Sequence, residues 1–159
     1  MSKGPTWSPE FTFATAPAFP SQFPHLRPDL CTGDVSPATT SYNCIAWAAT
    51  DTTAWWEPDL LGQYYWPEGV ERAYTREAYV SAFCSVGFEV CTDGVPELGA
   101  EKIVIYVRNG VPTHAARQLP DGCWTSKLGL CEDIEHMNLE CLNGPCYGEA
   151  AIYLKRPIA

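Results

Sequence analysis

The sequence predicts an α+β fold in which an N-terminal region with short helices packs on an antiparallel sheet. Two helix starts precede Gly87, and the segments after it include apolar runs joined by the turn pairs Asn109-Gly110 and Asp121-Gly122. Helices followed by hairpin-linked strands are typical of the α+β class. The length of 159 residues corresponds to one domain, and 46% hydrophobic against 18% charged residues is typical of a globular chain.

The first segment, residues 1–40, contains seven of the 14 prolines. Proline fixes φ and lacks an amide hydrogen, so this segment is predicted to be neither helix nor central strand. It also carries more aromatic rings than a free tail would: Trp7, Phe11, Phe13, Phe19 and Phe23. We therefore expect an extended arm that packs on the body, with residues 41–159 forming a single α+β domain.

The region after the arm predicts two helices separated by an aromatic loop. Asn43 is a favourable N-cap, and the alanine-rich run that follows it favours a short helix. Residues 51–69 combine tryptophan and tyrosine with proline, which predicts a loop. Thr75 is expected to cap a second helix over residues 76–86, which ends at a glycine.

The C-terminal half predicts four strands and one further helix. The continuous apolar run at residues 103–107 is typical of a buried strand, and Asn109-Gly110 favours a type I′ hairpin. The other expected elements are strands at 113–119, 124–128 and 149–154 and a short helix at 132–142. A two-residue turn at Asp121-Gly122 would pair Gln118 with Thr125 and place His114 opposite Gly129.

The charge balance restricts the partners. Ten lysines and arginines against 19 aspartates and glutamates give a net charge of −9, which repels nucleic acid and favours a basic or neutral partner. The longest apolar run, residues 44–49, is too short to cross a membrane. No export signal is visible at the N-terminus. We expect a cytoplasmic monomer, with delivery by a non-classical route left open.

The eight cysteines are expected to be free thiols in a reducing compartment, where most of them act as small buried hydrophobic residues. Cys141 and Cys146 have the separation of a zinc-binding pair, but no second pair matches them. The sequence therefore predicts neither a metal site nor a cofactor.

Cys44 is the candidate nucleophile. It would lie in the first turn of the helix that Asn43 caps, where free N–H groups and the helix dipole lower the pKa of a thiol. His114, one of three histidines, is the candidate base, which takes the thiol proton and returns it to the leaving group. The alternatives are a core cysteine and a structural histidine bonded to a backbone carbonyl.

A third group is expected to orient His114. Asp133 is preferred because a carboxylate best holds an imidazole tautomer, and Ser126, Glu132 and His136 are also in range. Asp133 could instead cap the helix predicted at 132–142, and His136 is expected on the surface of that helix.

The predicted oxyanion hole combines the backbone N–H of Cys44 with the side chain of Asn43 or Gln118. Capping of the helix is the alternative role of Asn43. A substrate cleft could be walled by aromatic rings of the loop, of which most are nevertheless expected in the core: Trp55, Trp56 and Trp66.

Two basic residues on the predicted strands, Arg117 and Lys127, either bind a substrate carboxylate or form surface ion pairs.

Several motifs together resemble an uncharacterised family of small, mostly bacterial proteins, over about residues 20–156. This resemblance implies membership of the family and brings no established activity. The motifs are Tyr42–Ala48, Trp55–Pro58, Tyr65–Pro67, Glu101–Tyr106, Thr113–Gln118, Asp121–Gly129 and Asp133–His136.

More loosely, the order of cysteine helix, histidine strand and third-residue strand resembles the papain-like fold. That fold includes NlpC-type peptidases, transglutaminase-like enzymes and amidases. His114-Ala115 followed by Asp121-Gly122-x-Trp124 is similar to a transglutaminase-type histidine strand and hairpin. The sequence departs from that pattern, since residues 126–129 lack the expected aspartate, and Lys102 stands where NlpC-type enzymes usually carry histidine. The resemblance thus implies at most a Cys–His dyad.

Two classes of function follow as hypotheses. In the first, a Cys44 thiolate attacks the carbonyl of a peptide, isopeptide or other amide, and the thioester passes to water or an amine. In the second, the same fold is a non-catalytic binding or interaction protein with an unused site. A delivered toxin-like effector would use the chemistry of the first class.

Overall fold

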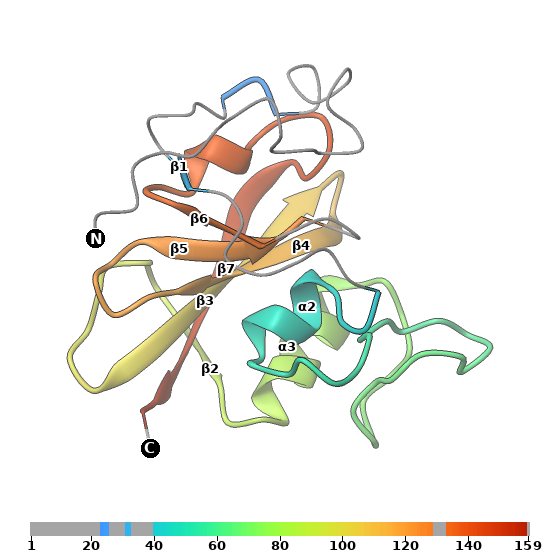
Figure 1. The fold of residues 1–159 in the computed structure, drawn as a ribbon. Helices are drawn as coiled ribbons and strands as arrows, with labels where there is room; N and C mark the ends of the chain where they lie inside the picture. The colour runs from blue at the N-terminus through green and yellow to red at the C-terminus, as the bar shows by residue number, and fades with distance from the viewer. Residues whose placement is uncertain (1–22, 26–30, 33–39, 129–132, 159) are drawn as a thin grey trace.

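The computed structural model describes residues 23–25, 31–32, 40–128 and 133–158. Over these ranges it has a seven-stranded antiparallel sheet in the order β1-β6-β5-β4-β3-β7-β2, with two short α-helices beside it (Figure 1). The elements in chain order are β1 Cys31–Thr32, α2 Cys44–Ala48, α3 Arg76–Cys84, β2 Glu89–Cys91, β3 Ala100–Arg108, β4 Val111–Gln118, β5 Trp124–Lys127, β6 Asp133–His136, the 3₁₀-helix η2 Glu140–Leu142 and β7 Glu149–Pro157.

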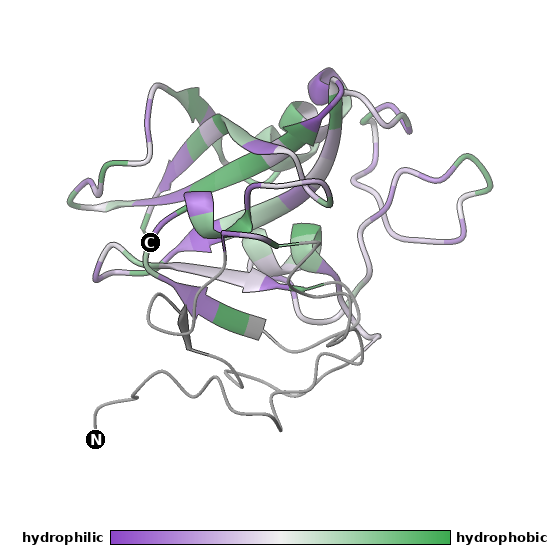
Figure 2. Cartoon of the chain, turned by 90° about the horizontal axis from the view of Figure 1, so that it is seen from above, coloured by the Kyte–Doolittle hydropathy of each residue, from purple (hydrophilic) through white to green (hydrophobic). Residues whose placement is uncertain are grey.

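The sheet separates two apolar cores, because successive residues of a strand point to opposite faces. Ile103 and Ile105 of β3 pack with residues of α2 and α3, and we call this side the helix face. Val104 and Tyr106 pack with Trp124 of β5 and residues near η2, on what we call the open face. Figure 2 shows hydrophobic and hydrophilic residues interspersed along the strands.

The two predicted helices are confirmed, with their caps. The Asn43 side chain accepts a hydrogen bond from the backbone N–H of Ala46, and Thr75 does the same for Ala78. The helix expected at 76–86 ends two residues earlier, at Cys84. None of the helices within the described residues is long and apolar enough to cross a membrane.

The aromatic loop between the helices is partly core, as expected. Trp56 and Trp66 are buried in the helix-face core. At the far end of the loop, Leu60 and Leu61 are 84% and 82% exposed. Figure 2 shows this segment projecting from the body with a hydrophobic tip.

One hairpin has the expected turn and the other shifts the register. Asn109 and Gly110 have φ values of 52° and 79°, as a type I′ turn requires. At the second hairpin, the Leu119 N–H donates to the Cys123 carbonyl, which leaves three residues in the loop instead of two. Gln118 therefore pairs with Trp124, and the prediction that it pairs with Thr125 is wrong by one residue.

The prediction of a helix at residues 132–142 is also wrong. Residues 133–136 form β6, which pairs with β5, and a 3₁₀ turn follows at 140–142. Ile134 and His136 are both buried, a period of two that is compatible with a strand and not with a helix. Sequence reasoning missed this because a four-residue strand acquires its stability from its neighbour.

The predicted arm lies largely outside the described residues, including Trp7, Phe11, Phe13 and Phe19. Phe23 is described, and its buried ring contacts Tyr147 on the open face with 5.1 Å between ring centroids. Within residues 1–40 the structure also places β1, a two-residue strand at the edge of the sheet.

Candidate functional site

The structure does not bring the candidate nucleophile and base together. Cys44 packs on the helix face, where its thiol contacts the backbone N–H of Ala115. His114 points to the open face, where its ring stacks on Tyr147 with 4.0 Å between centroids and meets the edge of Tyr106 at 5.4 Å. Adjacent residues of a strand point in opposite directions, so the sheet lies between Cys44 and His114.

The surroundings of Cys44 disfavour the charged, thiolate form of its side chain. Burial raises its pKa to about 11, because desolvation disfavours the charged form. Nearby N–H groups, including that of Ala115, and the Lys127 ammonium act in the opposite direction without offsetting burial. The helix start was predicted correctly, but a helix of five residues supplies too little field to outweigh desolvation.

Iodoacetamide is therefore expected to modify Cys44 much more slowly than the exposed Cys84. With a pKa of about 11, only about one thiol in a thousand is ionised at pH 8. The rates can be read by mass spectrometry of the folded protein between pH 6 and 10, with Cys84 as the internal standard. Preferential labelling of Cys44 below pH 7, lost in His114→Ala, would restore the Cys–His hypothesis.

The two basic residues considered for substrate binding take part in a layered aromatic stack beside Cys44. The rings of Tyr42 and Trp47 stack at 5.6 Å. The Arg117 guanidinium lies 4.4 Å from the Trp47 ring, and the Lys127 Nζ lies 5.5 Å from the Tyr42 ring. Lys127 is fully buried, so it is not a surface ion-pair residue.

The side-chain amides predicted to stabilise an oxyanion form hydrogen bonds within the fold instead. The Asn43 amide bonds to the backbone at Ala46 and to both the N–H and the C=O of Trp56. Gln118 Nε2 donates to the Gly94 carbonyl at 2.7 Å, on the open face. Neither amide has the position of an oxyanion donor beside Cys44.

The three tryptophans proposed as a cleft wall are anchored within their own loop. Indole N–H groups of Trp55, Trp56 and Trp66 donate to Glu57, Asp51 and the Glu71 carbonyl, respectively. None of the three lines the open-face cavity identified below.

The third-residue candidates pair with one another instead of with His114. Ser126 Oγ lies 2.8 Å from His136 Nε2, and His136 Nδ1 lies 2.8 Å from the Asn138 carbonyl oxygen. The carbonyl accepts from Nδ1–H, so Nε2 accepts the Ser126 hydroxyl hydrogen. Both side chains are buried, which corrects the expectation of a surface His136.

Asp133, the preferred third residue, is not the cap of a helix. It begins β6 and pairs with Lys127 in the sheet register. Its side chain lies outside the described part of the structure, as does all of Glu132.

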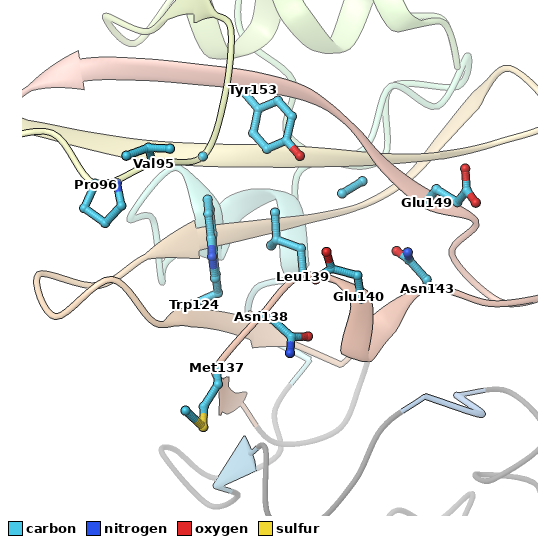
Figure 3. A pocket seen from close by; sticks show the side chains of 12 residues that line it. Val95, Pro96, Trp124, Met137, Asn138, Leu139, Glu140, Asn143, Glu149 and Tyr153 are labelled. Carbon is cyan, nitrogen blue, oxygen red and sulfur yellow. The ribbon is translucent and has the colours of Figure 1, made fainter.

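A cavity of about 640 Å³ opens on the open face of the sheet (Figure 3). Its aromatic side chains are Trp124 from β5 and Tyr153 from β7. Glu140 of η2 and Glu149 at the start of β7 lie at the opposite end from Trp124, with the amide of Asn143 between them. We call this space the open-face cavity.

The loop of residues 92–99 closes one side of the cavity, and contacts with side chains of the sheet hold it in place. Lys102 Nζ donates to the carbonyl and carboxylate oxygens of Asp93. Gly94 packs so closely on Trp124 that an added Cβ would lie 2.9 Å from the indole ring. The wall is therefore built by tertiary contacts that the sequence alone does not reveal.

The electrostatics of the open-face cavity are negative. Burial raises the pKa of the Tyr153 phenol, and the carboxylates of Glu140 and Asp93 raise it further. Within the described part of the chain, no lysine, arginine or histidine lines it. Sequence reasoning missed this site; its one signal was the acidic excess that favoured a basic partner.

No group of three or more metal-binding side chains is assembled within the described residues. Among the described residues, Cys44, Cys84, Cys91, Cys123 and Cys146 are free thiols.

A family model for a domain of unknown function, DUF7689, matches residues 34–155. The chain belongs to the DUF7689 family. The matched range contains Cys44, His114 and every residue that lines the open-face cavity. No curated protein and no solved structure matches the chain, so the papain-like resemblance of this DUF7689 protein has no support from relatives.

Proposed function

We propose that this DUF7689 protein is a binding module whose open-face cavity receives a cationic side chain of a basic peptide. The observation that carries the proposal is the composition of the cavity, which combines Trp124 and Tyr153 with the carboxylates of Glu140 and Glu149. None of the described residues that line it is basic. It develops the binding hypothesis, in which an acidic chain favours a basic partner.

Physical chemistry favours a cation over a neutral ligand there. A cation over an aromatic face gains about 0.5–2 kcal/mol, depending on its desolvation. Carboxylates accept hydrogen bonds only, and ammonium and guanidinium groups donate only. The net charge of −9 also raises the rate at which cations encounter this surface.

Catalysis by Cys44 and His114 has less support. A Cys–His pair would require β4 to present His114 on the other face, which breaks its pairing with β3 and β5. Binding in the open-face cavity requires no such rearrangement.

Calorimetric titration with a capped tri-lysine peptide tests the proposal. We expect saturable binding that weakens with added salt, and at least a fivefold loss of affinity in the double variant Glu140→Gln/Glu149→Gln. Glu77→Gln is the matched control, because Glu77 is exposed on α3 at the helix face and its loss should change affinity less than twofold.

A tri-lysine peptide with acetylated side chains separates charge recognition from general peptide binding. Equal binding of the acetylated and free peptides would contradict the proposal. So would unchanged affinity in the double variant. Spermidine in place of the peptide distinguishes a free polyamine from a peptide side chain, since tighter binding of spermidine would reassign the ligand class.

A further inference from the structure

A short segment beside the open-face cavity covers a buried histidine. Residues 143–148 connect η2 to β7, and we call them the Tyr147 strap. Gly144 and Gly148 close its base through two backbone hydrogen bonds of 3.0 and 2.8 Å. Tyr147 lies flat on the His114 ring, with 7° between the ring planes. The strap is therefore the lid over His114.

His114 is an unusual group to seal under such a lid. Its exposed fraction is 0%, and neither ring nitrogen has a hydrogen-bond partner in the described structure. Buried polar atoms are nearly always paired, so an imidazole with two unpaired nitrogens needs an explanation. A stacked neutral ring tolerates this position, whereas a charged ring without an acceptor does not.

We propose that the Tyr147 strap is a pH-sensitive latch, which protonation of His114 opens in mildly acidic solution. The closed strap holds His114 neutral. The open strap lets water solvate the imidazolium.

The groups around His114 all disfavour its charged form or leave it unaffected. The titratable groups that face it are Tyr106 from β3, Tyr147 from the strap and His136 from β6. Burial holds the pKa of His114 well below its usual range, and the charge of His136 lowers it further. No described carboxylate acts on it, so nothing stabilises the imidazolium in the closed state.

The sign of the pH effect follows from proton binding. The open state takes up a proton near the ordinary pKa of 6.5, and the closed state does so only at lower pH. The ratio of open to closed strap therefore rises as the pH falls below 6.5, by up to tenfold per pH unit. Opening unfolds the strap and so breaks the two backbone hydrogen bonds between Gly144 and Gly148. It also breaks the hydrogen bonds that Thr113 and Arg108 donate to the carbonyls of Tyr147 and Pro145.

The latch would also regulate the open-face cavity, a consequence that rests on the proposed function. Asn143 within the strap and Glu149 just after it both line that cavity. Opening of the strap moves these residues, so cation binding should weaken in acid. The latch itself is tested without ligand, which keeps its failure distinct from failure of the proposed function.

Hydrogen exchange of the full chain tests the latch. The amides of Gly144 and Gly148 should lose at least tenfold protection between pH 7.5 and 5, relative to the amides of β3 and corrected for intrinsic exchange rates. His114→Phe keeps the stacked ring and removes the titrating group, so its strap protection should not change with pH. His25→Gln, at an exposed histidine, should behave like the wild type.

Two results would overturn the latch. One is constant relative protection of the strap in the wild type, and the other is a full acid effect in His114→Phe. If His114→Phe does not fold, nuclear magnetic resonance of the wild type still tests whether protonation of His114 opens the latch. Titration of the His114 ring between pH 7.5 and 5 must coincide with changes at Gly144 and Gly148, and titration without them would falsify the latch.

Discussion

Replacing Asn43 with alanine is expected to lower the free energy of unfolding by about 2–4 kcal/mol. Asn43 Oδ1 accepts from the backbone N–H groups of Ala46 and Trp56, at 3.2 and 3.1 Å. Its Nδ2 donates to the Trp56 carbonyl at 2.7 Å. One buried side chain thus caps α2 and fastens the aromatic loop to it. Alanine would leave all three backbone groups unpaired.

Urea unfolding of Asn43→Ala measures this loss, and Thr75→Ala is the matched control. Thr75 caps α3 through a single hydrogen bond to the Ala78 N–H, so its loss should cost about 1 kcal/mol. Asn43→Asp keeps the acceptor and loses the donor, and it should lie between the wild type and Asn43→Ala. A loss in Asn43→Ala no larger than in Thr75→Ala would show that the bridge to Trp56 adds no stability.

The second large effect is expected from acid. Burial lowers the pKa of His136 to about 4, although the Asn138 carbonyl raises it in part. The unfolded chain binds this proton near pH 6.5, so the stabilisation is complete above that pH and is lost as the pH falls toward 4. Between pH 7.5 and 5 the free energy of unfolding should fall by about 2 kcal/mol from His136 alone.

Urea unfolding at pH 7.5, 6 and 5 tests this dependence in the wild type and in His136→Gln. The variant loses the titrating ring, so its stability should fall by about 2 kcal/mol less than that of the wild type over this range. Carboxylates contribute little to the comparison, because those held below their ordinary pKa remain ionised at pH 5. Identical pH dependence in the two proteins would contradict a buried neutral His136.

Much of the fold was predictable because it is encoded in local chemistry. Asn43 and Thr75 each accept a hydrogen bond from an N–H three residues on, so their helix starts can be read without tertiary information. Asn109-Gly110 tolerates positive φ at both positions, so its hairpin can be read as well. The strand at β6 could not be read in this way, because its pairing with β5 decides its conformation.

The candidate site was predicted less well, because a site depends on which faces meet. Cys44 was placed correctly at a helix start, but its surroundings raise its pKa instead of lowering it. Ser126 and His136 were both named as neighbours of His114, yet they bond to each other. The open-face cavity joins residues from loop 92–99, β5, η2 and β7, and no local pattern connects segments so far apart.

The sequence by itself determined the α+β class, both helix starts, the type I′ hairpin and membership of DUF7689, since each depends on residues close together or on a family pattern. Only the tertiary structure decided which side chains share a face. A third loop residue at Asp121-Gly122 moves the pairing of β4 and β5 by one position, and a one-residue shift changes which side chains face each other. Cys44 and His114 lie on opposite sides of the sheet because Ala115 faces the helices and its strand neighbour His114 therefore faces the other way.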